Sequence, residues 1–198
     1  MKYLISILVA IFIAGCVNTS TVHPDKTIKK NNGAILASIT KSGGADDVWF
    51  FYRKVGEKKE KRMDAIGLTM IGIPDDFPND DSKDGRVLVF EEPPGEYELT
   101  KWMIYDFGVN SYKYIYPKNI EPIRFSVKPN EITYLGNLHV NVLKAKNIFG
   151  VPIVAGGVAT IRDNYAQDVA IFKKKYPKLS NLPIRKEVKP IVGWGMPR

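Results

Sequence analysis

The chain has 198 residues, of which 44% are hydrophobic and 25% are charged. This composition is typical of a globular protein and argues against a disordered chain. The formal net charge of +8 favours contact with anionic surfaces, but no aromatic and basic RNA-binding signature is present, so nucleic acid is not an expected partner.

Residues 1–15 have the organisation of a secretory signal peptide. Lys2 supplies a positive charge, and the apolar run 4–13 that follows is too short to span a bilayer. Small residues then precede Cys16, which is the only cysteine of the chain. No disulfide can therefore form within the chain, and the thiol of an exported protein needs another role.

The segment Ile13-Ala14-Gly15-Cys16 resembles the lipobox of bacterial lipoproteins. In that family the cysteine receives a diacylglyceryl group, the signal is cut just before it, and the new amine is acylated. The resemblance implies a membrane-anchored protein of the cell envelope, with acyl chains such as palmitate on Cys16. Val17 is not the Asp associated with inner-membrane retention, which favours the periplasmic face of the outer membrane in a Gram-negative organism. An ordinary signal peptide that ends near a cysteine is the alternative.

Residues 18–32 are polar, with almost no apolar periodicity, and cannot bury enough surface to order themselves. We therefore expect residues 16–32 to form an acylated, solvated tether about 20 Å in reach. Residues 33–198 then have the length of a single domain with a respectable core.

Short apolar segments with Gly and Pro between them dominate this domain. Segments 34–40 and 48–55 are separated by a turn-rich stretch and predict a hairpin. The further predicted strands are 64–73, 86–91, 96–105, 112–116, 123–127, 132–142 and 151–161. This pattern predicts a mainly β fold, an antiparallel β-sandwich.

One helix is predicted at 165–176, with Asn164 or Asp163 as its cap and Pro177 after its end. Its apolar residues recur at helical spacing, and three lysines near its C-terminal end complement the helix dipole. The same lysines could form a positive surface for a partner. The tail 178–198 is expected to be irregular, with Ile191 and Trp194 packing back on the sandwich.

Two stretches, 92–99 (EPPGEYEL) and 125–138 (FSVKPNEITYLGNL), carry a second resemblance. They are similar to segments of prealbumin-like and carboxypeptidase-regulatory-like β-sandwich domains found in uncharacterised bacterial lipoproteins. The resemblance implies a sandwich fold and an envelope location. It carries over no catalytic residue.

Residues 80–91 match the spacing of the twelve-position EF-hand calcium loop. The candidate ligands would be Asp80, Ser82, Asp84, the carbonyl of Arg86, and Glu91. Prolines on both sides leave no room for the usual flanking helices, so an acidic turn that leads into a strand is the competing interpretation. Calcium is thus the one cofactor for which the sequence offers a pattern.

The segment 105–116 has aromatic residues around an expected turn at 108–110. Tyr105, Tyr112, Tyr114 and Tyr116 are candidates for an exposed partner-binding loop, because tyrosine gives contact area at low entropic cost. Core tyrosines on paired strands are the competing interpretation.

No nucleophile elbow, phosphate loop or histidine cluster is present in the sequence, so we expect no enzyme activity. A non-catalytic module that binds an envelope protein or glycan is the first hypothesis. An accessory subunit of an envelope or secretion assembly and a calcium-supported hydrolase are the alternatives.

Overall fold

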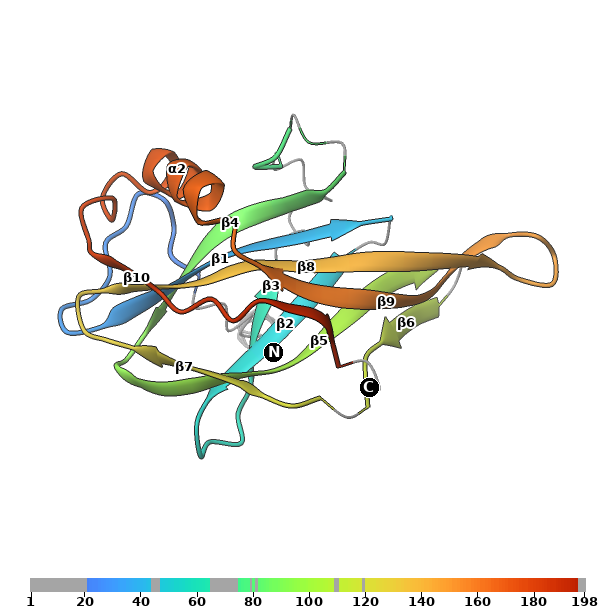
Figure 1. The fold of residues 1–198 in the computed structure, drawn as a ribbon, viewed down its shortest axis with the longest axis horizontal. Helices are drawn as coiled ribbons and strands as arrows, with labels where there is room; N and C mark the ends of the chain where they lie inside the picture. Colours follow the sequence, from blue (N-terminus) through green and yellow to red (C-terminus); the bar gives the residue numbers. More distant parts are fainter. Residues whose placement is uncertain are drawn as a thin grey trace, which may run out of the picture.

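The computed structural model describes residues 21–43, 47–64, 75–78, 80, 82–108, 111–118 and 120–195, with the backbone alone for 106–108 and 111–115. Among these residues, a pair of β-sheets forms a sandwich, and one α-helix lies on the outer side of one sheet (Figure 1). The predicted fold class, a mainly β sandwich with one C-terminal helix, is confirmed.

The first sheet has six strands, in the order β11, β9, β8, β1 and β4, with β10 beside β8. Their bounds are β1 (Gly33–Ser42), β4 (Asp84–Glu92), β8 (Ile132–Lys146), β9 (Pro152–Arg162), β10 (Ile184–Lys186) and β11 (Ile191–Trp194). β8 and β9 form a long hairpin that projects beyond the rest of the sandwich (Figure 1).

The second sheet has five strands, with β3, β2, β5 and β6 in that order and β7 also beside β5. Their bounds are β2 (Asp47–Lys54), β3 (Lys61–Asp64), β5 (Gly95–Gly108), β6 (Ser111–Ile115) and β7 (Ile123–Val127). β5 is long enough to pair with β7 along its first half and with β6 along its second. Of the strand predicted at 64–73, only Asp64 is described, at the end of β3.

The predicted hairpin of 34–40 and 48–55 is wrong, because β1 and β2 belong to different sheets. β1 pairs with β4 and β8, whereas β2 pairs with β3 and β5. A turn-rich connection suits either a hairpin or a crossing to the opposite sheet, and its residues do not distinguish the two. The β1–β8 and β10–β8 pairs are parallel, and the other strand pairs described are antiparallel.

Alternate residues of the six-stranded sheet fill two separate cores, one on each face. In β1, Ile35 and Ile39 point into the space between the sheets, whereas Ala34 and Leu36 point to the outer face. The five-stranded sheet contributes Phe50, Tyr52 and Trp102 to the inner core.

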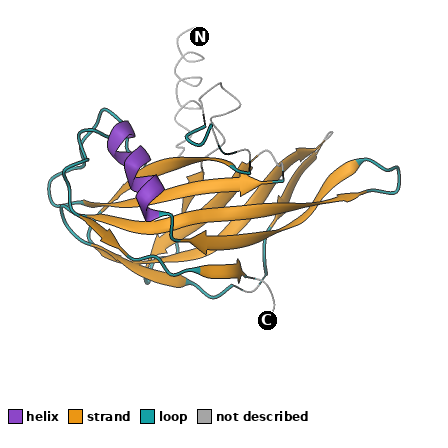
Figure 2. Cartoon of the chain, turned by 45° about the horizontal axis from the view of Figure 1, so that its top comes forward, coloured by secondary structure: helices purple, strands orange, loops and turns teal. Residues whose placement is uncertain are grey.

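The outer core is closed by the helix α2 (Tyr165–Lys175), which crosses the six-stranded sheet (Figure 2). Phe172 and Tyr176 are buried beneath it with the outer-facing residues of β1, β4 and β8. Asn164 occupies the N-cap position, but its side chain makes no capping hydrogen bond. Asp163 Oδ1 instead accepts a hydrogen bond from the Tyr165 backbone N–H at 3.3 Å.

Part of the segment 21–32 lies against this outer face, whereas the tether prediction placed the whole segment in solvent. Val22 is buried, and its N–H donates to the Val89 carbonyl at 2.8 Å. The Lys29 N–H and the Asn32 Nδ2 both donate to Glu91 Oε1, at 2.9 and 2.6 Å. Within the described residues, contacts with the domain therefore extend back to residue 21.

The C-terminal tail packs on the sandwich, as predicted for Ile191 and Trp194, and it is more regular than expected because it adds β10 and β11. Trp194 is buried in the inner core, where its ring stacks on Phe50 with 6.3 Å between centroids. The Trp102 Nε1 donates to the Trp194 carbonyl at 2.7 Å. The tail thus completes the core between the sheets.

Candidate functional site

The five predicted calcium ligands do not converge on one point. Asp84, Arg86 and Glu91 all lie in the continuous strand β4. A strand rises about 3.3 Å per residue, which puts Asp84 about 23 Å from Glu91 and excludes a shared ion. The competing interpretation of the sequence, an acidic turn that leads into a strand, describes the geometry.

The acidic residues at the start of this segment have partners within the chain. Asp80 Oδ1 accepts hydrogen bonds from the Ser82 hydroxyl and, at 3.1 Å, from the Ser82 N–H. The hydrogen bond from the Ser82 hydroxyl holds the pKa of the Asp80 carboxyl below its usual range. Asp80 also pairs with Lys83 at 3.2 Å, and Asp84 pairs with Lys41 at 3.4 Å. Across the described residues, no group of three His, Cys, Asp or Glu side chains is arranged to hold a metal ion.

Of the four candidate partner-binding tyrosines, two have described side chains. Tyr105 lies on the outer face of the five-stranded sheet, and Tyr116 follows β6 with 55% of its surface exposed. The side chains of Tyr112 and Tyr114 lie outside the described residues.

Tyr105 belongs to a stack of three planar groups. The Trp49 ring lies 5.2 Å from the Tyr105 ring at an angle of 11°, and the Arg62 guanidinium lies 4.3 Å from the Trp49 ring centroid. Because β2 lies between β3 and β5, the Trp49 ring is held between its two neighbours. Trp49 therefore presents an edge to solvent and not the open ring face on which a sugar would stack.

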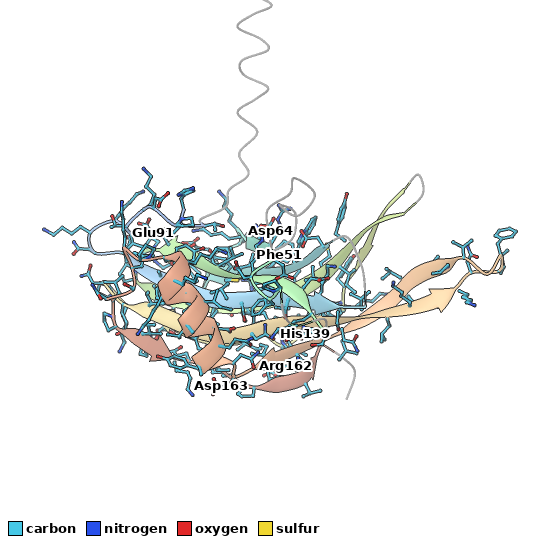
Figure 3. The ribbon with its side chains drawn as sticks, turned by 90° about the horizontal axis from the view of Figure 1, so that it is seen from above. Phe51, Asp64, Glu91, His139, Arg162 and Asp163 are labelled. Atoms are coloured by element: carbon cyan, nitrogen blue, oxygen red, sulfur yellow. The ribbon has the colours of Figure 1, made fainter. Side chains whose placement is uncertain are left out.

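A second aromatic residue with a cation above it lies next to this stack. Phe51, labelled in Figure 3, has Lys101 Nζ 4.8 Å from its ring centroid, and Lys101 pairs with Glu60 at 2.5 Å. Trp49 and Phe51 contact edge to face at 6.5 Å. We call these residues, Trp49, Phe51, Arg62, Lys101 and Tyr105, the aromatic face.

Under and beside α2 the outer face of the six-stranded sheet carries a row of buried polar side chains. Asp168 on the helix is fully buried, and its Oδ2 accepts hydrogen bonds from the Ser38 hydroxyl at 2.5 Å and the Tyr134 hydroxyl at 2.7 Å. Asn137 Nδ2 donates to Ser38 and to Thr40, both at 2.9 Å. Burial raises the pKa of the Asp168 carboxyl. The row links the helix to β1 and β8.

His139 continues this polar row beyond the helix (Figure 3). Its Nδ1 lies 2.8 Å from the Thr40 hydroxyl and its Nε2 lies 3.2 Å from the Ser42 hydroxyl. Burial, with a smaller contribution from nearby Arg162, lowers the pKa of His139 to about 4. A histidine with that pKa is a weak base at neutral pH, and its Nδ1 contacts a hydroxyl where a catalytic histidine has a carboxylate. The arrangement therefore favours a structural role.

The largest group of exposed apolar residues in the described chain lies at the end of the β8–β9 hairpin. Ile148 is 93% exposed and Phe149 is 82% exposed, with Leu143, Val151 and Ile153 between 39% and 51%. We call residues 143–153 the hairpin tip. Figure 2 shows the hairpin extending past the rest of the sandwich.

The turn of the hairpin tip is held by Asn147. Its Oδ1 accepts hydrogen bonds from the backbone N–H groups of Phe149, at 2.9 Å, and Val151, at 3.0 Å. Its carbonyl accepts from the Gly150 N–H at 2.9 Å, and Gly150 has a φ of +76°, which glycine adopts at little cost. The exposed apolar residues are therefore presented by a defined turn.

Cys16, the candidate lipidation residue, lies outside the described residues. Among the helices that the structure describes, none combines the length and the hydrophobicity needed to cross a membrane.

Comparisons with known proteins identify no family for this chain. No family model and no curated protein matches the chain. One similar solved structure is a leucine-rich repeat protein from Bacteroides thetaiotaomicron, with 13% identity over 55% of this chain and a TM-score of 0.29. The match covers 14% of that protein, and at this TM-score it carries no argument about fold or function. The resemblances to lipoproteins and to prealbumin-like domains stay predictions.

Sequence reasoning did not find the hairpin tip or the aromatic partners of Tyr105. The tip was detectable, because Ile148 and Phe149 are adjacent apolar residues where a turn between two predicted strands normally has polar ones. Trp49 and Phe51 alternate with core residues of β2, but alternation alone does not show which face is covered.

Proposed function

We propose that this chain is a lipid-anchored lipoprotein of the bacterial cell envelope whose domain is a non-catalytic module that binds another envelope component. The observation that carries the proposal is the position of Cys16, the only cysteine, at the end of a signal-like segment and five residues ahead of Thr21, which contacts the domain. Several acyl chains on one cysteine exceed the single-chain threshold for stable attachment.

The short distance between Cys16 and the domain supports this arrangement. Thr21 already forms a β-bridge with Phe90. Even a fully extended chain gives at most about 3.6 Å per residue, so the five steps from Cys16 to Thr21 reach no further than about 18 Å. An acylated Cys16 would hold the domain close to the membrane.

The aromatic face supports a binding role and favours a protein partner over a glycan. Interfaces are enriched in Trp, Tyr, Phe and Arg, and the aromatic face combines all four. The Trp49 ring has Tyr105 on one side and Arg62 on the other, so it offers no open face on which a sugar would stack. A partner would contact ring edges and the cations beside them.

The anchor is tested by mass spectrometry of the protein purified from membranes. We expect a mature N-terminus at Cys16 with a mass increase equal to diacylglyceryl and acyl groups. Cys16→Ser should give an unmodified chain that is released from the membrane fraction. An unmodified thiol, or a different N-terminus, would remove the lipoprotein proposal.

The binding role is tested by a photo-crosslinking amino acid at Phe51, with a matched control at the exposed Val192 on the other sheet. We expect one envelope protein to be captured from Phe51 and not from Val192. A stoichiometric complex of several subunits would favour an accessory role in an assembly. Equal capture at the two positions would contradict binding at the aromatic face.

A further inference from the structure

We infer that the hairpin tip inserts into the anionic bilayer to which the chain is anchored and provides a second membrane contact beside Cys16. This inference rests on the proposed function, because the anchor brings the tip to that surface. It follows from the tip's apolar exposure, its backbone hydrogen bonds, its charge and its position in the sheet.

The apolar side chains of the hairpin tip are adjacent and lie on a convex surface. Ile148 and Phe149 lie at the end of a ribbon that stands clear of the sandwich (Figure 1), and neither is more than one fifth buried. Soluble proteins rarely expose adjacent large apolar side chains without a role in binding. A convex apolar tip enters a fluid hydrocarbon layer without needing a complementary pocket.

Three consecutive N–H groups of the turn are already paired within the turn. Phe149, Gly150 and Val151 all donate their N–H groups to atoms of Asn147. In a bilayer no water replaces a missing hydrogen bond, so an irregular segment enters only if its donors are satisfied internally. Asn147 lets these three consecutive residues leave water with their donors paired.

The charge of the hairpin suits an anionic surface. The sequence between Glu131 and Asp163 contains no Asp or Glu. Lys144 and Lys146 lie just behind the turn, and alternation along β8 puts them on the face of the ribbon opposite Leu143 and Ala145. The end of the hairpin thus has an apolar tip and a basic face, the distribution found in segments that lie in the interface of anionic membranes.

The register places the tip far from the anchor along the strands. Thr21 bridges Phe90, which pairs with Ile35, which in turn pairs with Thr133. The tip residue Ile148 lies about fifteen residues further along, or about 50 Å at strand rise. With a link of at most about 18 Å from Cys16, both points reach one bilayer when the strands lie roughly along its surface.

The hairpin tip offers only a small contact area, and this favours the membrane that carries the anchor over a soluble partner. Two exposed apolar side chains and two lysines bind a membrane only weakly by themselves. An anchor on the same chain converts this second contact into an intramolecular event at high effective concentration. A soluble partner protein would lack that advantage.

The test uses the full chain purified from membranes and reconstituted in phosphatidylcholine vesicles, with and without phosphatidylglycerol. Ile148→Cys provides a thiol for a fluorophore, and Val192→Cys is the control, because Val192 is 84% exposed and apolar but lies on β11. We expect quenchers on the acyl chains to quench the label at 148 and not at 192, mainly in the vesicles with anionic lipid.

Two variants of the labelled chain sharpen the test. Phe149→Ser should lower the ratio of inserted to free tip about tenfold. Lys144→Gln should lower it about fivefold in anionic vesicles and leave it unchanged in neutral ones. The inference would be overturned if quenching at 148 did not exceed quenching at 192, or if neither substitution changed the quenching at 148. A protein partner would then be the favoured binder of the hairpin tip.

The unsubstituted chain serves as a control that separates failure of the lipid anchor from failure of the hairpin tip to insert. Its only thiol is that of Cys16, so fluorophore on that chain would show that Cys16 carries no lipid and would count against the proposed function. The comparison is then repeated with Cys16→Ser in every variant, at a concentration of anionic vesicles high enough to replace the effective concentration that an anchor would supply. At that lipid concentration, stronger quenching at 148 than at 192 would still support the inference, and equal quenching would still overturn it.

Discussion

The two halves of β8 both pair with β9, from Asn137 onward, yet they lie in opposite environments. From Ile132 to Val140 every residue is buried, whereas from Asn141 to Lys146 only Val142 is. The first half has the five-stranded sheet on its inner face and α2 over some of its outer face, and the second half extends past both. Pairing with β9 is therefore common to the two halves, but only the first half is also covered along its length by β1 and by layers on both faces. We expect stability to reside in the first half and surface contacts in the second.

The largest effect should separate two leucines of this strand. Leu138 is fully buried and Leu143 is 44% exposed. Leu138→Ala should lower the free energy of unfolding by about 2 to 5 kcal/mol, because it removes buried surface and leaves a cavity. Leu143→Ala, the matched control, should change it by less than about 1 kcal/mol. Urea unfolding of both variants checks this, and equal losses would show that the exposed half is as important for stability as the buried half.

The next effect concerns the contact between α2 and the buried half. Asp168→Ala removes the acceptor of the Ser38 and Tyr134 hydroxyls, and both donors would stay buried. We expect a loss of about 2 to 3 kcal/mol. In a double-mutant cycle with Tyr134→Phe, coupling of about 1 kcal/mol should appear. Additive losses would mean that the Tyr134 hydrogen bond contributes nothing to the attachment of the helix.

The pH dependence of unfolding should show a smaller effect from His139. Its pKa is lowered to about 4 in the folded state by burial, with Arg162 and Lys83 adding and Asp80 opposing. In the unfolded chain the pKa of histidine is about 6.5, so between pH 4 and pH 6.5 the imidazole is protonated in the unfolded chain and neutral in the folded one. The stability that this group contributes is therefore present above pH 6.5 and is lost as the pH falls toward 4. The expected loss is about 2 kcal/mol after allowance for solvent screening.

His139→Gln isolates this contribution. Asp168 acts in the opposite sense, because burial raises the pKa of its carboxyl in the folded state and its contribution is lost as the pH rises above the unfolded value. The difference between the wild-type and His139→Gln profiles removes the Asp168 contribution. A difference that is flat between pH 4 and 6.5 would contradict a buried neutral His139.

The sequence predicted the elements better than their pairing. Alternation located β7 at its observed bounds and the helix to within one residue, because periodicity records which side chains are buried. It did not predict that β1 and β2 join different sheets, since a turn such as 41–47 has the same composition in either case. The parallel β1–β8 pair joins residues about one hundred positions apart, and no local signal encodes it.

The candidate sites show the same limit. The spacing 80–91 fits a calcium loop only if the chain curls, and the strand formed by Arg86 to Glu91 prevents that. Asp168 lies one helical turn before Phe172, on the same face, so its burial could be predicted from the sequence. Its hydrogen-bond partners Ser38 and Tyr134 could not. The apolar turn at 148–149 could also be predicted from the sequence. Its projection beyond the sandwich could not, because it depends on β8 and β9 being longer than the strands beside them.

The smallest expected effect on stability is that of the double substitution Ile148→Ser and Phe149→Ser. Both side chains are almost fully exposed, so their removal from the folded state uncovers no core, and the turn keeps its hydrogen bonds to Asn147. The free energy of unfolding in detergent-free buffer should change by less than about 0.5 kcal/mol. A loss above about 1 kcal/mol would mean that the tip packs on another region of the chain. A change within that limit, together with loss of the contact with anionic vesicles, would separate folding from surface contact along a single strand.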